Sequence, residues 1–198
     1  MYQTIRSGVA IAALAFTAFS MHAKSLRAAD QPLLSLRAFA VDMSSPGAAR
    51  SGTLDIVIER WSSEAERQTL RDALIESGSD KLLSTLQRMK PRAGYIRSGS
   101  SLGWDIHYAR EEVSPVTGGR RIVFATDRPM GSWEIINRPR SADYEFTFGE
   151  IRIGADGKGE GKLVPAAKVH FDKDTQVVEI ENYASEPVRL TTVSADRK

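Results

Sequence analysis

The chain of 198 residues contains no cysteine. This absence excludes disulfide bonds, thiol nucleophiles, iron–sulfur clusters and cysteine-ligated zinc, so stability must come from an ordinary packed core. An excess of one charge is also lacking, because 27 Lys and Arg stand against 25 Asp and Glu. The near-neutral balance argues against a dedicated nucleic-acid-binding protein, which needs a strongly basic surface. We therefore expect no nucleic-acid partner.

Histidine is scarce, and outside the N-terminal segment only His107 and His170 are present. A zinc or iron site generally needs three or more convergent ligands, so we predict no metal and no cofactor. The stretch from Asp156 to Gly161 is similar to the start of a calcium-binding loop. Lys158 occupies a position that needs an oxygen ligand, and we therefore interpret this stretch as a hairpin turn.

Long hydrophobic runs are absent except at the N-terminus, where Gly8–Phe19 follows Arg6 and no acidic residue precedes Asp30. This layout predicts a secretory signal peptide over residues 1–23, with cleavage after Ser20 or Ala28 as alternatives. The run is shorter than the roughly 20 residues that span a membrane. A buried N-terminal helix is the other interpretation. We expect a periplasmic or extracellular protein with a flexible tail over 24–32, a single domain over 33–198 and no transmembrane segment after signal removal.

Hydrophobic alternation predicts strands over 33–43 and 53–61, followed by a change to helical spacing. Ser63 and Glu66 form a capping-box signature, and Gly78 is placed to end that helix. A second short helix is expected from about Asp80 to Pro91. The remainder alternates between short strands and turns, with strands expected near residues 93–98, 104–112, 120–127, 143–153, 162–171, 175–183 and 187–193.

These elements predict an α+β, mostly β fold. We expect a curled antiparallel sheet or a partly open β-barrel of about nine strands, with a two-helix insertion after the second strand. One strand is irregular in pattern, because Phe146 and Phe148 share a face whereas Ile151 and Ile153 lie on the other. We interpret this change of phase as a β-bulge near Gly149.

The most specific catalytic string is Gly99-Ser100-Ser101-Leu102-Gly103, which matches the G-x-S-x-G pattern of serine hydrolases. The residues after it alternate as a strand, whereas that pattern requires a helix there. We therefore predict a hairpin loop and no catalytic residue. A serine hydrolase that uses Ser101 with His107 or His170 is kept as an alternative.

The segment 127–142 is unusually long for a connection between strands, which commonly runs to about 4–6 residues. Its aromatic and arginine side chains suit a carboxylate, a phosphate or a stacked ligand. The alternative is a structural plug whose arginines pair with acids. We name four candidate ligand-binding residues in it: Arg128, Trp133, Arg138 and Arg140.

The C-terminal part resembles a family of small exported bacterial β-rich proteins of unknown function. The resemblance lies in Thr126 to Pro129 with Trp133-Glu134, in Gly159 to Leu163, and in Glu181 to Tyr183 followed by Pro187 to Leu190. It implies export and a β-rich domain, and it supplies no activity or catalytic residue. We expect a non-enzymatic binding or accessory module for an unknown small molecule, lipid or envelope protein. A structural envelope-associated protein is a further alternative.

Overall fold

The structure is a computed structural model that describes residues 31–44, 50–99, 101–130 and 143–196. The predicted signal peptide lies outside these residues. The described part contains one helix, α1 (Glu64–Arg88), and nine strands. The strands are β1 (Leu34–Asp42), β2 (Arg50–Ile58), β3 (Gly94–Ser98), β4 (Trp104–Val113), β5 (Arg120–Thr126), β6 (Phe146–Ile153), β7 (Lys158–Asp172), β8 (Val177–Asn182) and β9 (Val188–Ala195).

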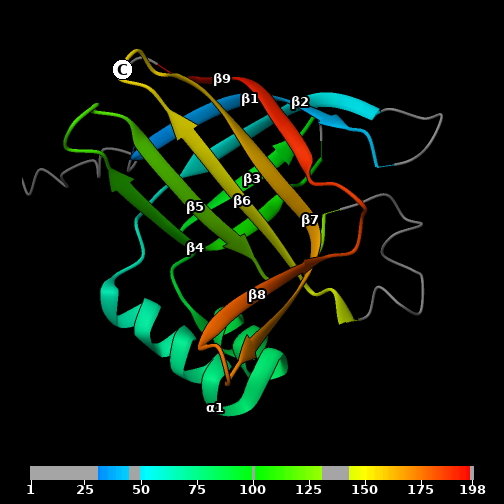
Figure 1. The fold of residues 1–198 in the computed structure, drawn as a ribbon. Coiled ribbons are helices and arrows are strands. Elements are labelled where there is room, and N and C mark those ends of the chain that lie inside the picture. The colour runs from blue at the N-terminus through cyan, green and yellow to red at the C-terminus, as the bar shows by residue number, and fades with distance from the viewer. Residues whose placement is uncertain (1–30, 45–49, 100, 131–142, 197–198) are drawn as a thin grey trace, which may run out of the picture. The chain divides into compact units, whose positions relative to one another are not determined.

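Eight of these strands form a closed antiparallel β-barrel (Figure 1). Their order is β6-β5-β4-β3-β2-β1-β9-β7, and β7 pairs with β6 to complete the ring. Strand β8 pairs with β7 and lies outside the ring. The prediction of a mostly β, antiparallel fold is confirmed. The prediction that the barrel is partly open is wrong, because β7 bonds to both neighbours.

Closure depends on the length of β7. Its residues 158–163 pair with β9, residues 159–167 pair with β6, and residues 167–172 pair with β8. The sequence prediction began this strand at 162, because it assigned Gly159 and Gly161 to a turn. Gly159 is instead a strand residue that the neighbouring backbone approaches closely, and a Cβ there would lie 1.9 Å from the carbonyl oxygen of Arg152. Residues 166–182, which continue past the barrel as a two-stranded hairpin, are called the arm below.

The barrel interior is a packed core. Large aliphatic side chains alternate inward from every strand of the ring, as a barrel of about eight strands requires to fill its centre. Among the side chains with no more than 2 % exposure in this cluster are Leu36, Ile56, Ile58, Ile96, Ile106, Ile122, Phe124, Ile151, Leu190 and Val193. A ligand site is therefore expected on the outside of the wall.

Helix α1 begins as the sequence predicts. The Ser63 side chain accepts a hydrogen bond from the Glu66 backbone N–H, and the Glu66 carboxylate accepts one from the Ser63 backbone N–H. The predicted pair of helices is not confirmed, because the structure has one helix from Glu64 to Arg88. Gly78 inside it is non-helical, with φ 78° and ψ −164°, a conformation that favours glycine. The glycine therefore kinks α1 into two helical stretches, at the residue where the sequence placed the end of the first helix.

A second apolar layer lies between α1 and the outer face of the barrel. Leucines of α1 pack there against Ala125, Phe146 and Val169. Phe146 and Phe148 thus face outward toward α1, whereas Ile151 and Ile153 face the interior. The predicted bulge near Gly149 is wrong, because β5 and β6 pair there without a shift. The register changes earlier, between Phe146 and Phe148, in the pairing with β7.

Gly149 faces the interior and makes room for Phe124, a fully buried ring. A Cβ at residue 149 would lie 2.1 Å from Cζ of Phe124. We predict that Gly149→Ala lowers the free energy of unfolding by about 1–3 kcal/mol, because an overpacked core must shift. Urea denaturation measures this change.

The matched control is Gly52→Ala, since a Cβ at that strand position meets nothing within 4 Å. That variant should remain within about 0.5 kcal/mol of the wild type, as surface substitutions do. Equal losses of stability in the two variants would contradict the assigned packing of Phe124.

Candidate functional site

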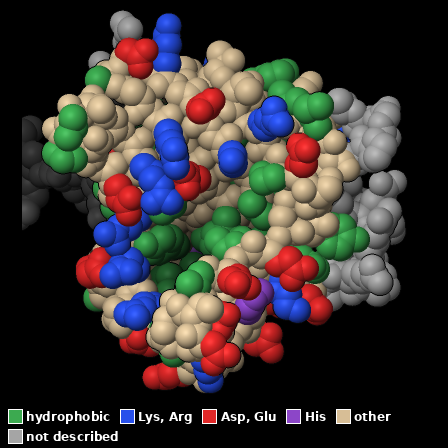
Figure 2. All heavy atoms as spheres, viewed as in Figure 1, with side chains coloured by type: hydrophobic (Ala, Val, Ile, Leu, Met, Phe, Trp, Pro, Cys, Tyr) green, Lys and Arg blue, Asp and Glu red, His purple; other side chains and the backbone are tan. Residues whose placement is uncertain are grey.

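An apolar groove lies outside the barrel, between α1, the barrel wall and the arm. Its volume is about 170 Å³. Figure 2 shows hydrophobic side chains around a hollow on this face, beside a band of Lys and Arg. Thirteen residues line the groove: Arg67, Leu70, Arg71, Leu74, Leu82, Leu86, Tyr108, Ala125, Phe146, Phe148, Val169, Val178 and Ile180.

Three parts of the chain that are distant in sequence form the groove. Both halves of α1 contribute leucines, because Leu70 and Leu74 precede the kink at Gly78 and Leu82 and Leu86 follow it. Strands β4, β5 and β6 provide Tyr108, Ala125 and the two phenylalanines, on the wall face opposite the packed interior. The arm provides the remaining side.

The arm side of the groove is open to solvent. Val178 and Ile180 of β8 are 47 % and 49 % exposed, although their side chains line the groove. Val177 and Glu179 lie on the opposite face of the same strand, since side chains alternate along a strand. Half-exposed apolar side chains next to an apolar hollow indicate a surface where an apolar group of a ligand or partner can bind.

The charged residues in the groove lining are both arginines. Arg67 pairs with Glu64 in the first turn of α1, whereas Arg71 forms no ion pair with any described residue and is exposed. Tyr108 is the remaining polar residue, and burial raises the pKa of its hydroxyl, which keeps it neutral at ordinary pH. The groove thus combines apolar walls with positive charge at its rim.

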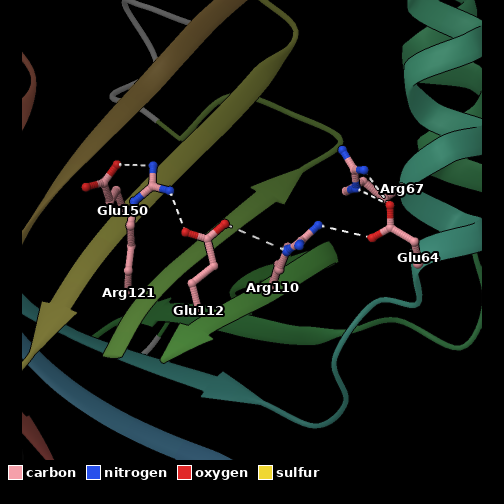
Figure 3. A network of polar contacts seen from close by, with 6 residues as sticks. All are labelled: Glu64, Arg67, Arg110, Glu112, Arg121 and Glu150. Atoms are coloured by element: carbon pink, nitrogen blue, oxygen red, sulfur yellow. Dashed lines mark hydrogen bonds and ion pairs between the residues drawn. The ribbon is translucent and has the colours of Figure 1, made fainter. Parts of the chain in front are cut away.

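A ladder of alternating charges fixes the start of α1 to the barrel beside this groove (Figure 3). It runs through Glu150, Arg121, Glu112, Arg110, Glu64 and Arg67. Arg121 bridges Glu150 and Glu112 at 2.9 and 3.0 Å, and Arg110 Nη1 lies 3.2 Å from the Glu64 carboxylate. Arg121 holds the pKa of Glu150 below its usual value. Exposed ion pairs contribute little to stability, so the ladder orients α1 more than it stabilises it.

A second, shallower hollow of about 580 Å³ lies at the barrel end that carries the β4–β5 and β6–β7 turns. Several Arg and Lys side chains line it, but three of them form ion pairs with glutamates. Arg120 pairs with Glu111, Arg121 belongs to the charge ladder, and Arg152 pairs with Glu150. Neutralised cations attract an anionic ligand weakly, so this hollow is the weaker candidate.

The site predicted in the segment 127–142 falls mostly outside the described residues. Trp133, Arg138 and Arg140 lie outside the described residues. Arg128 is described and exposed: its Nη2 donates to the Gly103 carbonyl at 2.6 Å, and its guanidinium lies 5.9 Å from the Trp104 ring centroid. The described residue of the predicted set is thus held against the end of the β3–β4 hairpin.

Ser101 lies in the predicted hairpin loop between β3 and β4. Its hydroxyl accepts a hydrogen bond from the Ser98 backbone N–H at 3.2 Å. His107 pairs with Asp127, and His170 lies 2.6 Å from a Glu179 oxygen. Within the described part of the chain, no hydrogen bond joins Ser101 to either histidine, and the hydrolase alternative has gained no support from these contacts.

Sequence reasoning identified the leucine stripes of α1 and the strand that becomes β8, but it did not join them in one site. The useful signal was present in β6, where Phe146 and Phe148 alternate with inward residues. That pattern indicates a strand with two apolar faces, and a helix that covers the outer one.

Comparisons with known proteins identify no relative: no family model, curated protein or solved structure matches the chain. The resemblance to exported β-rich proteins stays a prediction. Over the described residues, no helix has the length and apolar character needed to cross a membrane. In the same part of the chain, no three His, Asp or Glu side chains gather in a way that could hold a metal ion.

His107 and Asp127 form a partly buried pair with a 3.5 Å separation between Nε2 and Oδ2. The Asp127 carboxylate raises the pKa of His107 above 6.5, and His107 lowers the pKa of Asp127 below 3.8. The pair therefore stabilises the fold most between about pH 4 and 6.5. This contribution is lost as pH rises through the folded-state pKa of His107, and also as pH falls through that of Asp127.

We predict that Asp127→Asn lowers the pKa of His107, as NMR of its imidazole would measure. The stability difference between wild type and variant should be larger at pH 5.5 than at pH 8.5. A His107 titration that is the same in both proteins would contradict the pairing.

Proposed function

We propose that the protein is an exported, non-enzymatic binding module whose groove holds the apolar chain of an amphipathic anion. The observation that carries this proposal is the composition of the groove. Ten of its thirteen lining residues are apolar, one is a neutral tyrosine, and the two charged ones are both arginines. A ligand complementary to this lining has an apolar body and a negatively charged end.

The size of the groove indicates how much of a ligand it holds. Pockets that enclose a whole drug-sized molecule measure about 300–1,000 Å³. A volume of about 170 Å³ suits a segment of an alkyl chain, with the rest of the molecule in solvent. The anionic end then lies near Arg71, the rim arginine that forms no ion pair with a described residue.

Apolar burial supplies most of the expected affinity, at roughly 0.8 kcal/mol for each buried CH₂ group. The positive charge at the rim orients the ligand and adds a smaller electrostatic contribution to the binding free energy, which salt screens. Affinity should therefore rise with chain length until the groove is filled, and it should fall modestly as ionic strength rises.

Isothermal titration calorimetry with dodecanoate, below its micelle concentration, tests the proposal. Val178→Asp places a carboxylate in the groove wall and should weaken dodecanoate binding by at least about tenfold, a loss of about 1.4 kcal/mol. Val177→Asp is the matched control. It makes the same change at a similarly exposed valine on the opposite face of β8.

Val177→Asp should change the dissociation constant by less than about twofold. Arg71→Gln should weaken the binding of dodecanoate but leave that of the uncharged alcohol dodecanol unchanged. The proposal fails if dodecanoate does not bind the wild type saturably, or if the two valine substitutions weaken its binding equally.

A further inference from the structure

We infer that the free edge of β8 binds an extended segment of a partner protein, which adds to the arm as a further antiparallel strand. The partner segment has alternating apolar and basic residues. This inference rests on the backbone and charges of β8 and stands independently of an anion in the groove.

The backbone of β8 has an unpaired edge. In the described part of the chain, β8 pairs with β7 alone and ends the sheet order. The Tyr183 N–H donates to the Ala166 carbonyl at 3.0 Å. Because only alternate residues of an antiparallel strand bond to a given neighbour, this bond determines which residues of β8 bond to β7. Glu179 and Glu181 therefore bond to β7, whereas Val178, Ile180 and Asn182 direct their N–H and C=O groups away from it.

The edge lacks several of the features by which proteins commonly prevent strand addition, and its charged residues are two glutamates. Such features are proline, lysine or a bulge on the edge strand, or a covering segment. The β8 sequence Val-Val-Glu-Ile-Glu-Asn has neither proline nor lysine, and its pairing with β7 runs without a register shift. Its first five residues are all exposed. A partner strand can therefore reach the outward-facing backbone groups of Val178 and Ile180.

The two faces of β8 specify the side chains of the partner. Val178 and Ile180 lie on the groove face, about half exposed, so partner residues beside them are apolar. On the other face, Glu179 and Glu181 stand near Asp172 and Asp143, with Lys168 and His170 as the neighbouring bases. Figure 2 shows acidic side chains clustered around a histidine on this side of the molecule. Partner residues opposite the glutamates are therefore basic.

A second copy of this chain fits the edge poorly. An antiparallel pairing of two β8 strands centred on Ile180 would place Glu179 of one copy opposite Glu181 of the other, and like charges directly opposite destabilise a pair. The partner is therefore a different polypeptide whose strand carries Lys or Arg at alternate positions. Strand addition of this kind takes affinity from main-chain hydrogen bonds and specificity from alternate side chains.

The probe is a fluorescent heptapeptide, acetyl-Lys-Val-Lys-Val-Lys-Val-Lys-amide, titrated with the full chain and followed by anisotropy. In the proposed register the peptide valines hydrogen-bond to β8 and its lysines direct their backbone groups outward. N-methylation of the three valines should weaken binding at least tenfold. N-methylation of three lysines, with the same composition, should weaken it less than threefold.

Charge is tested on the protein. Glu181→Lys should weaken binding of the lysine peptide at least fivefold and should strengthen binding of the matching Glu-Val peptide. Glu186→Lys makes the same change in the turn after β8, where the glutamate lies near Arg189, and should have less than a twofold effect. Dodecanoate binding should be the same in Glu181→Lys and wild type, which separates failure of this inference from failure of the groove proposal.

Three results would overturn the inference. The lysine peptide could fail to bind saturably, the two N-methylated peptides could bind equally well, or light scattering could show a homodimer that Glu181→Lys abolishes. The last result would assign the edge to a second copy.

Discussion

Closure of the barrel through β7 is the constraint on which the rest of the structure depends. One strand of 15 residues bonds to β9 in its first half, to β6 along much of its length and to β8 in its second half. Closure removes two sheet edges and lets aliphatic side chains fill the interior. Because the interior is filled, binding surfaces must lie on the outside, where β7 continues into the arm.

The outer wall becomes a binding surface because several of its strands are apolar on both faces. In β6, Ile151 points into the barrel while Phe146 and Phe148 point toward α1. The kink at Gly78 lets leucines from both halves of α1 reach the same hollow. Val178 and Ile180 then belong to two surfaces at once. Their side chains line the groove, and their backbone groups form the free edge of β8.

Local features of this fold could be predicted from the sequence, and long-range ones could not. The capping box at Ser63, the alternating strands and the mostly β class follow from short-range chemistry, and they are confirmed. The sequence did not predict closure of the barrel, because the glycines around Gly159 are typical of a turn. Gly159 is a strand residue because the backbone of Arg152 approaches it too closely for a side chain. The groove was missed because it needs α1, the wall and the arm together. Three of the four predicted site residues lie outside the described part of the chain.

Methyl NMR during a titration with dodecanoate tests most directly whether the outer groove, and not the barrel interior, binds an apolar chain. The account predicts that the largest shifts occur at the methyl groups of Leu74, Val178 and Ile180, which line the groove. The methyl groups of Ile56 and Ile96, fully buried inside the barrel, should stay unchanged. Large shifts at those interior isoleucines, with little change in the groove, would contradict it.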